Sequence, residues 1–382
     1  MTRVFVSDAI LQERLTIGLA RPGQDQPLRG WKTLSALYQA SLAAYGYRIA
    51  PIVRPEIYKA DVARRVLGVE PGDWHLAVKP IEHLRPFHYI PNVFVCDWPF
   101  AELSTGPLGD SPFFDQARLL RMADAVLCCT DFTRDTLLAA GVERAVTLPP
   151  HIPPSSSRPK ATGASRQGTG CRFLSVVDVD HLSRQLGPTI EGFAEAARQR
   201  DGLNLVIFVQ GADAETLASL RQRVVQAGTA QGPEDTISVL GYAGAEAAAG
   251  LYDSVDFFLC ADAVAGLRLP LIDAMLAGIP LVTTRNTGIA SFVAEEAAVP
   301  ITTERTTLDH ADEPIARFLP LTGYPPTADA VRDAVLVAAA LDDAARSRMA
   351  VIGRETADRR FGLEAFKADL SALSAFVSLE TS

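Results

Sequence analysis

A regular alternation of short apolar runs with amphipathic stretches constrains the fold of this chain more than any other feature. Continuous apolar runs are typical of strands buried on both faces of a parallel sheet. Helical patterns separate several of them, as in "WKTLSALYQASLAAYG" and "FTRDTLLAAGV". Repeated strand–helix–strand units predict an α/β fold with right-handed crossovers. In the first part of the chain the predicted strands are "RVFVSDA", "YRIAPIV", "WHLAVK", "NVFVCDW", "AVLCCT" and "AVTLPP".

The alternation stops at residues 151–170, which are rich in Pro, Ser and Gly and are predicted to be a linker. It then restarts with strands at "RFLSVVDV", "LNLVIFVQG", "TISVLGY", "DFFLCAD", "PLVTT" and "AAVPIT". Helices are expected at about 187–199, 213–227, 244–252 and 270–277, and the end of the chain is expected to be wholly helical. We therefore predict two doubly wound domains, 1–150 and 171–355, with ligands bound at the carboxyl ends of the strands, in a shared groove.

The bulk numbers exclude several classes of protein. The 382 residues exceed one ordinary core, and the formal charge of −9 disfavours nucleic-acid binding. No apolar run reaches the length of about 18–20 residues that a membrane helix needs, and the N-terminus lacks the apolar region of a signal peptide, so a cytoplasmic protein is expected. The five cysteines lie in apolar, strand-like stretches without a CxxC spacing, which predicts buried reduced thiols.

Residues 265–284, "AGLRLPLIDAMLAGIPLVTT", predict a loop, a short helix and a strand. Pro270 suits the first helical position, and Gly278 suits the position just past the helix end. The loop would present backbone N–H groups and the positive end of a helix to an anion such as a diphosphate. Asp273, one turn into the helix, could accept hydrogen bonds from a ribose diol. An ordinary strand–helix turn remains the alternative from these residues alone.

The same stretch resembles the donor-binding signature Glu-x7-Glu of the retaining GT-B glycosyltransferases of the GT4-like group (glycosyl transferases group 1). Two further segments, "GYAGAEAAAGLYDSVDFFLCAD" and "FFDQARLLRMADAVLCCTDFTRDTLLAAGVERAVTLPPHI", also look like that family, in the expected order. The resemblance implies two Rossmann-like domains facing a central cleft. The first would hold the acceptor and the second the donor, with a C-terminal helix, 356–382, crossing back to the first.

The resemblance also implies an activity: transfer of a sugar from a nucleotide-sugar donor to a glycan or glycolipid acceptor, in polysaccharide or cell-surface glycan biosynthesis. The nucleotide sugar is a substrate, so no cofactor is expected. The family generally uses helix ends and cations, so no metal is expected either. Association with a membrane surface stays open.

The chain departs from the signature at its head. Asp273 stands where the family's second Glu holds the ribose, but Ala265 replaces the first Glu, which contacts a hydroxyl of the donor sugar. The nucleotide half of the signature is thus kept and the sugar-reading half is lost. This suggests an unusual donor such as a deoxysugar.

A second departure concerns the two cations that flank the diphosphate in the family. Asp178 lies near the position of the family's Arg, and Gln185 or Leu186 lies near that of its Lys. We hypothesise that Arg184, Arg268 or both clamp the diphosphate instead, since a departing diphosphate needs its growing charge stabilised. The alternative is that both are solvated surface arginines.

The remaining site residues rest on the same resemblance. On the donor side they are Gly266, Leu267, Leu269, Gly211, Gly241, Tyr242 and Gln185. On the acceptor side Asp97 is expected to contact the acceptor or the donor sugar, Trp98 to stack on a sugar ring, and Gly30 to belong to a loop near the phosphates. For Trp98 and Asp97 the alternative is a core-capping ring and the start of a turn.

Three other interpretations compete. "DVD", residues 178–180, invites a metal site, but Asp-x-Asp metal binding belongs to another glycosyltransferase architecture. The weakened cation set and Ala265 favour, as the alternative function, a catalytically inert glycosyltransferase-like binding or regulatory protein. A sugar epimerase or phosphorylase on the same fold would need a denser set of His and carboxylate side chains than can be placed here.

Overall fold

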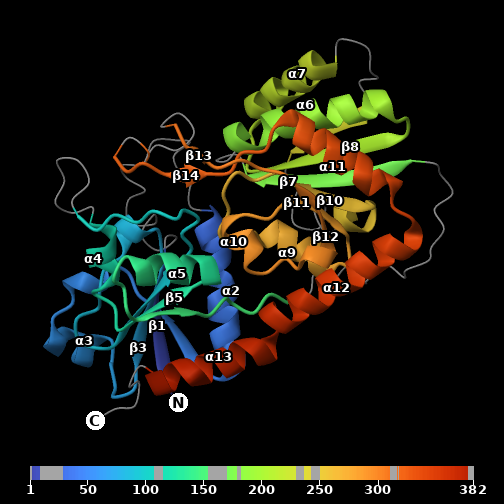
Figure 1. Ribbon diagram of the computed structural model, residues 1–382. Helices are drawn as coiled ribbons and strands as arrows, with labels where there is room; N and C mark the ends of the chain where they lie inside the picture. Colours follow the sequence, from blue (N-terminus) through green and yellow to red (C-terminus); the bar gives the residue numbers. More distant parts are fainter. Residues whose placement is uncertain are drawn as a thin grey trace. The chain divides into compact units, whose positions relative to one another are not determined.

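The computed structural model describes residues 2–8, 29–106, 115–153, 170–178, 182–228, 236–241, 250–309, 316 and 318–376. The chain divides into two compact units (Figure 1). The first comprises Met1–Pro153, Ile315–Leu321 and Arg360–Ser382, and the second comprises Pro154–Pro314 and Thr322–Arg359. Each unit is built around its own parallel six-stranded sheet. The fold class is therefore the predicted one, α/β with two Rossmann-like halves.

The sheet of the first unit has the order β2-β1-β3-β4-β5-β6, with all neighbours parallel. All six predicted strands are present: β1 Arg3–Asp8, β2 Arg48–Pro51, β3 Trp74–Val78, β4 Asn92–Cys96, β5 Ala125–Cys128 and β6 Ala145–Thr147. The described α-helices of this unit are α2 Arg29–Tyr45, α3 Ala60–Val66, α4 Gln116–Leu120, α5 Asp131–Ala139 and α13 Leu363–Phe376. Strand order reverses between β1 and β3, which is where doubly wound sheets bind ligands.

The second sheet has the order β12-β11-β10-β7-β8-β9, again all parallel. Its strands also match the prediction: β7 Cys171–Asp178, β8 Leu203–Gln210, β9 Ile237–Gly241, β10 Phe257–Cys260, β11 Leu281–Thr284 and β12 Ala298–Ile301. The described helices are α6 Leu182–Gln199, α7 Ala214–Gly228, α9 Leu269–Leu276, α10 Thr287–Ala290, α11 Ala328–Ala340 and α12 Asp343–Phe361. In this sheet the order reverses between β7 and β10.

The core of the second unit forms where α6 and α11 pack against the sheet. Phe173, Phe193 and Phe257 are fully buried there, and the ring of Phe173 contacts the other two rings. Gly192 lets the two helices approach, since a Cβ at this position would lie 2.4 Å from the carbonyl oxygen of Ala328. Helix α6 begins five residues before its expected start at 187 and carries Pro188 inside it. The helix expected at 244–252 lies largely outside the described residues.

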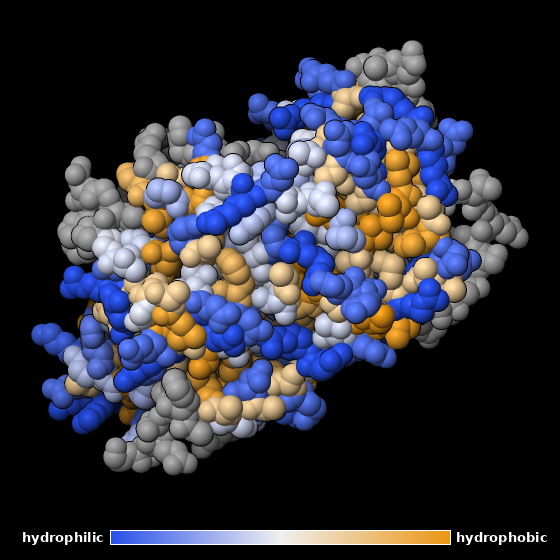
Figure 2. Space-filling model, viewed as in Figure 1, coloured by the Kyte–Doolittle hydropathy of each residue, from blue (hydrophilic) through white to orange (hydrophobic). Residues whose placement is uncertain are grey.

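The end of the chain is helical, as expected, but in two pieces. Helix α12 ends at Phe361 and α13 begins at Leu363. Phe366, Leu370 and Leu373 of α13 are buried. Exposed positions of α12 are mostly polar, and on the face shown in Figure 2 hydrophobic residues emerge in separate patches among hydrophilic ones.

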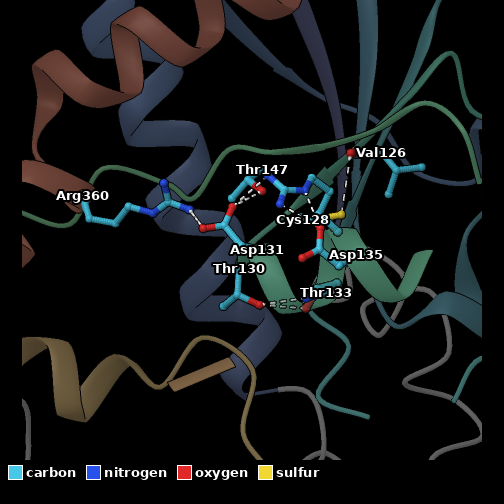
Figure 3. A network of polar contacts seen from close by, with 9 residues as sticks. Val126, Cys128, Thr130, Asp131, Thr133, Asp135, Thr147 and Arg360 are labelled. Carbon is cyan, nitrogen blue, oxygen red and sulfur yellow. Dashed lines mark hydrogen bonds and ion pairs between the residues drawn. The ribbon is translucent and has the colours of Figure 1, made fainter. Parts of the chain in front are cut away.

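A polar network in the first unit ties this C-terminal segment to α5 (Figure 3). The carboxylate of Asp131, the first residue of α5, accepts hydrogen bonds from Thr147 at 2.7 Å, Arg134 at 3.0 Å and Arg360 at 2.9 Å. The backbone N–H of Ile152 also donates to the carbonyl of Phe361. Arg360–Ser382 accordingly groups with Met1–Pro153.

An excursion of the chain between β12 and α11 was not predicted. It contains a two-stranded antiparallel sheet, β13 Thr306–Thr307 with β14 Thr322–Gly323, and a bridge between Thr303 and Pro326. These strands are too short to leave a periodic signal in the sequence.

Candidate functional site

The loop that follows β10, residues 261–268, lies at the carboxyl edge of the second sheet, where the strand order reverses. It runs directly into α9. Pro270 occupies the first turn of that helix, and Gly278 follows its end with φ +70°, as the sequence predicts. Leu269 is the first residue of α9, and Leu267 is buried. The start of a helix carries a partial positive charge that can stabilise an anion, although the N–H groups of Leu271 and Ile272 here donate to the Arg268 carbonyl.

The loop is held from one side by the turn that follows β11. The N–H of Ala265 donates to the Thr287 hydroxyl, which donates in turn to the Ala265 carbonyl, both at 2.9 Å. The N–H of Gly288 reaches the same carbonyl at 2.8 Å. A Cβ on Gly288 would lie 2.6 Å from the Ala265 oxygen, so only glycine fits here. The backbone around Ala265 is therefore fixed.

Two further contacts hold the start of the loop. The hydroxyl of Thr284 donates to the carbonyl of Asp262 at 2.8 Å. The N–H of Tyr324, on the return of the excursion, donates to the carbonyl of Ala263 at 2.9 Å. The loop is thus preorganised by hydrogen bonds from the next strand and from the excursion.

Arg268 lies inside this edge of the sheet. Its Nε is 2.8 Å from Oδ2 of Asp262, and its Nη2 donates to the carbonyl of Val176 in β7 at 2.8 Å. Both charged side chains are more than nine-tenths buried. The guanidinium thereby joins β7 to the loop after β10, across the point where the strand order reverses. The solvated-surface alternative for Arg268 is wrong, because the side chain is buried; the expected contact with a diphosphate stays a prediction.

Asp273 lies in α9, and no described residue donates a hydrogen bond to its carboxylate. Burial raises its pKa to about 6, because the ionised form loses hydration without gaining a partner. The nearby Tyr252 hydroxyl donates instead to the carbonyl of Pro270 at 3.2 Å. A buried carboxylate that accepts no hydrogen bond from the protein is suited to accept hydrogen bonds from a ligand.

The other donor-side candidates are spread over neighbouring strand ends. Gly211 follows β8 with φ +83°, and Gly241 ends β9 against Leu217. Tyr242 and residues 179–181 lie outside the described residues. Arg184 and Gln185 belong to the first turn of α6, but their side chains, like that of Asp178, are outside the described part, so their proposed roles stay predictions.

In the first unit, Asp97 follows β4 and is half-buried. Burial, with the charge of Asp97 as a further cause, raises the pKa of the neighbouring Cys129 thiol well above its usual value. Trp98 stacks edge-on against Phe100, and its indole N–H donates to the carbonyl of Glu102 at 2.7 Å. Gly30 lies in the first turn of α2, with open space around it. Stacking of Trp98 on a sugar stays a prediction.

Sequence reasoning missed the polar groups at both points of strand reversal. In the second unit these are Asp262, in the loop after β10, and Thr287, which follows β11 and bonds that loop at Ala265. In the first they are Asp8, at the end of β1, and Lys79, directly after β3, both at most 5% exposed. Burial lowers the pKa of Lys79. For Asp8, Lys79 and Asp262 the available signal was a charged residue at the carboxyl end of an apolar run predicted to be a strand; Thr287 had no such signal.

Within the described residues, no group of three or more His, Cys, Asp or Glu side chains is placed to hold a metal ion. The described helices likewise include none that is both long and apolar enough to cross a membrane. All five cysteines are buried and unbridged.

Comparisons with known proteins agree with this architecture. Residues 176–313 match the model of the family glycosyl transferases group 1. A search of curated proteins finds no significant match.

Three solved structures illustrate the likeness. HepE from Anabaena, in complex with UDP and glucose, aligns with a TM-score of 0.60 at 13% identity, over 98% of this chain and 100% of that one. An α,α-trehalose 6-phosphate synthase from Burkholderia multivorans aligns with a TM-score of 0.59 at 14% identity, over 98% and 99%. A TarM mutant from S. aureus, in complex with Fondaparinux, alpha-GlcNAc-glycerol and UDP, gives 0.57 at 11% identity, over 79% of this chain.

The chain spans only 55% of the length of TarM, so the likeness to that protein concerns the shared fold. The two parallel sheets and the solved structures indicate the same fold. The chain has the GT-B fold, and its residues 176–313 match the family glycosyl transferases group 1.

Proposed function

We propose that the protein is a retaining glycosyltransferase that moves a sugar from a nucleotide-sugar donor to a glycan or glycolipid acceptor, in polysaccharide or cell-surface glycan biosynthesis. The observation that carries the proposal is that the 261–268 loop leads directly into the helix that contains Asp273. Among the described residues the N–H of Gly266 in this loop has no acceptor and can donate to a diphosphate, and the Asp273 carboxylate is an acceptor without a described donor. UDP is the first nucleotide to test, since HepE and TarM are complexed with it.

Transfer of the sugar requires that the negative charge on the leaving diphosphate be stabilised. As the bond between the anomeric carbon and the diphosphate breaks, negative charge grows on the leaving group. Within the described residues the charge of Arg268 is balanced by Asp262. We therefore assign most of this stabilisation to oriented backbone N–H groups, which act without a metal ion in this proposal.

Ala265 bears on the donor sugar. A methyl group cannot accept a hydrogen bond from a sugar hydroxyl, so a donor that lacks the hydroxyl read by the family's Glu loses nothing here. We propose a deoxysugar donor on this ground. Selectivity of the purified protein for donors that carry that hydroxyl would contradict this part of the proposal.

The test is a thermal-shift screen with UDP, GDP, CMP, ADP and dTDP, followed by isothermal titration of the best nucleotide. A ligand present at about 100 times its Kd stabilises the folded protein by about 2.7 kcal/mol, which is several degrees in Tm. Asp273→Asn should abolish the shift, whereas Asp329→Asn, on the exposed start of α11, should keep it. A wild-type protein that no nucleotide stabilises would overturn the proposal.

The second candidate is an inert glycosyltransferase-like binding or regulatory protein, which the loss of the Glu at Ala265 favours. The two candidates differ in turnover. Release of nucleotide from a nucleotide sugar, with or without acceptor, indicates the enzyme, and binding without any release indicates the inert protein.

A further inference from the structure

Thr287 adopts a backbone conformation that β-branched residues avoid. Its φ is +46°, in the left-handed region, and the only other described non-glycine residue with positive φ is the exposed Arg54. Thr287 itself is only 7% exposed. Such strain persists only where the surroundings enforce it, and it concentrates at functional sites. The strained backbone of Thr287 therefore indicates a functional role for this residue.

The Thr287 hydroxyl fixes the backbone at Ala265 by hydrogen bonds. Thr287 Oγ1 bonds both the N–H and the carbonyl of Ala265, and that carbonyl also accepts from the N–H of Gly288. The peptide between Ala265 and Gly266 is planar and trans, so its N–H points opposite to its carbonyl. Because the carbonyl faces Thr287 and Gly288, the Gly266 N–H faces away from them.

The Gly266 N–H donates to no described residue. It lies three residues before α9, at the carboxyl edge where the strand order reverses. An oriented donor without a partner, fixed by a strained and buried threonine, has the form of a preorganised anion contact.

We propose that Thr287 is a positioning residue for the transfer reaction, and that it aims the Gly266 N–H at the leaving diphosphate of the donor. The inference rests on the proposed function. Because the Gly266 N–H is fixed before charge develops on the leaving group, it stabilises the transition state more than the bound, intact nucleotide sugar. Loss of the hydroxyl should therefore lower kcat and leave the affinity for the intact nucleotide sugar nearly unchanged.

The experiment compares Thr287→Ala, Thr287→Gly and Thr287→Ser with the wild type. Glycine adopts positive φ without strain, so Thr287→Gly folds even if the alanine variant does not. Release of UDP from UDP-glucose and from its deoxyglucose analogues gives kcat and KM for the nucleotide sugar that the wild type turns over fastest. Thr287→Ala and Thr287→Gly should lower kcat by about tenfold or more while KM for the nucleotide sugar changes by less than about threefold. Thr287→Ser, which keeps the hydroxyl, should retain kcat.

A matched control separates positioning from stability. Thr327 caps α11 through its hydroxyl, which accepts from the N–H of Ala330 at 3.1 Å, in the same unit. Thr327→Ala should lower Tm without lowering kcat. Amide exchange supplies a readout that needs no turnover: UDP should slow exchange at Gly266 in the wild type and in Thr287→Ser, but not in Thr287→Ala.

The outcomes are distinct. A wild type that binds neither UDP nor any other nucleotide of the screen overturns the proposed function and this inference with it. A wild type that binds UDP without protecting Gly266, or a Thr287→Gly variant with unchanged kcat, overturns the inference alone and leaves the proposed function standing.

Discussion

Arg268 and Asp262 form an ion pair of 2.8 Å inside the carboxyl edge of the second sheet, with both side chains more than nine-tenths buried. The same guanidinium holds the carbonyl of Val176, so the pair connects β7 to the loop after β10. These two strands are the neighbours between which the strand order reverses. The pair therefore fixes the geometry of the edge that we assign to the diphosphate.

Arg268→Met should destabilise the second unit by about 3–5 kcal/mol, because it removes the cation paired with the buried Asp262 carboxylate. Adding Asp262→Leu should recover much of this loss, since an apolar pair of similar volume costs no desolvation of charge. Urea unfolding of the two single variants and the double variant gives the coupling energy. Simple additivity of the two losses would show that the charges do not depend on each other.

Asp273 should give opposite pH dependences to stability and to nucleotide binding. Its pKa is about 6 when folded and about 3.8 when unfolded, so the folded state binds the extra proton between these values. Above pH 6 the ionised Asp273 lowers the free energy of unfolding. As the pH falls from 6 towards 4, protonation in the folded state restores up to about 3 kcal/mol of it. A ribose diol needs the ionised form, so affinity should rise with pH through 6.

Asp273→Asn therefore should stabilise the unliganded protein at pH 7 and weaken nucleotide binding. Thermal melts and titrations at pH 5, 6 and 7 check both parts, with Asp329→Asn as the exposed control. If the variant bound nucleotide as the wild type does, the assignment of Asp273 to the ribose would be wrong.

The predictability of this chain differs between its strands and its site. All twelve described strands of the two parallel sheets follow from continuous apolar runs, and α9 follows from Pro270 and Gly278, because each signal is local. The Arg268–Asp262 ion pair and the hydrogen bonds between Thr287 and Ala265 cannot be predicted from a local sequence pattern. Each depends on which strand ends lie side by side, and a sequence does not state strand order.

His75 makes the first unit sensitive to acid. The ring is fully buried in β3, with Nε2 2.8 Å from the Ser7 hydroxyl and Nδ1 2.9 Å from Oδ1 of Asn92. Burial lowers its pKa to about 4. The unfolded state binds a proton below about pH 6.5, so this contribution to stability is complete above 6.5 and is lost as the pH falls to 4.

The measurement is the urea midpoint of the first unit from pH 7 to 4, followed by near-ultraviolet circular dichroism. His75→Gln cannot titrate, so its profile should be flatter than that of the wild type, although its stability at pH 7 is lower because the two buried hydrogen bonds change. His88→Gln, at an exposed position, is the matched control and should follow the wild type. Parallel profiles for wild type and His75→Gln would refute the assignment.

The ion pair of Asp131 with Arg360 should hold the C-terminal segment on the first unit (Figure 3). Both side chains are about a third exposed, so Arg360→Met should cost only about 1 kcal/mol. That loss should appear as faster amide exchange in α13, whose Phe366, Leu370 and Leu373 are buried. Arg354→Met is the control, because Arg354 pairs with Asp358 of its own helix. Equal exchange in α13 for both variants would mean that apolar packing alone holds this segment, and that the Asp131 network serves only α5 and β6.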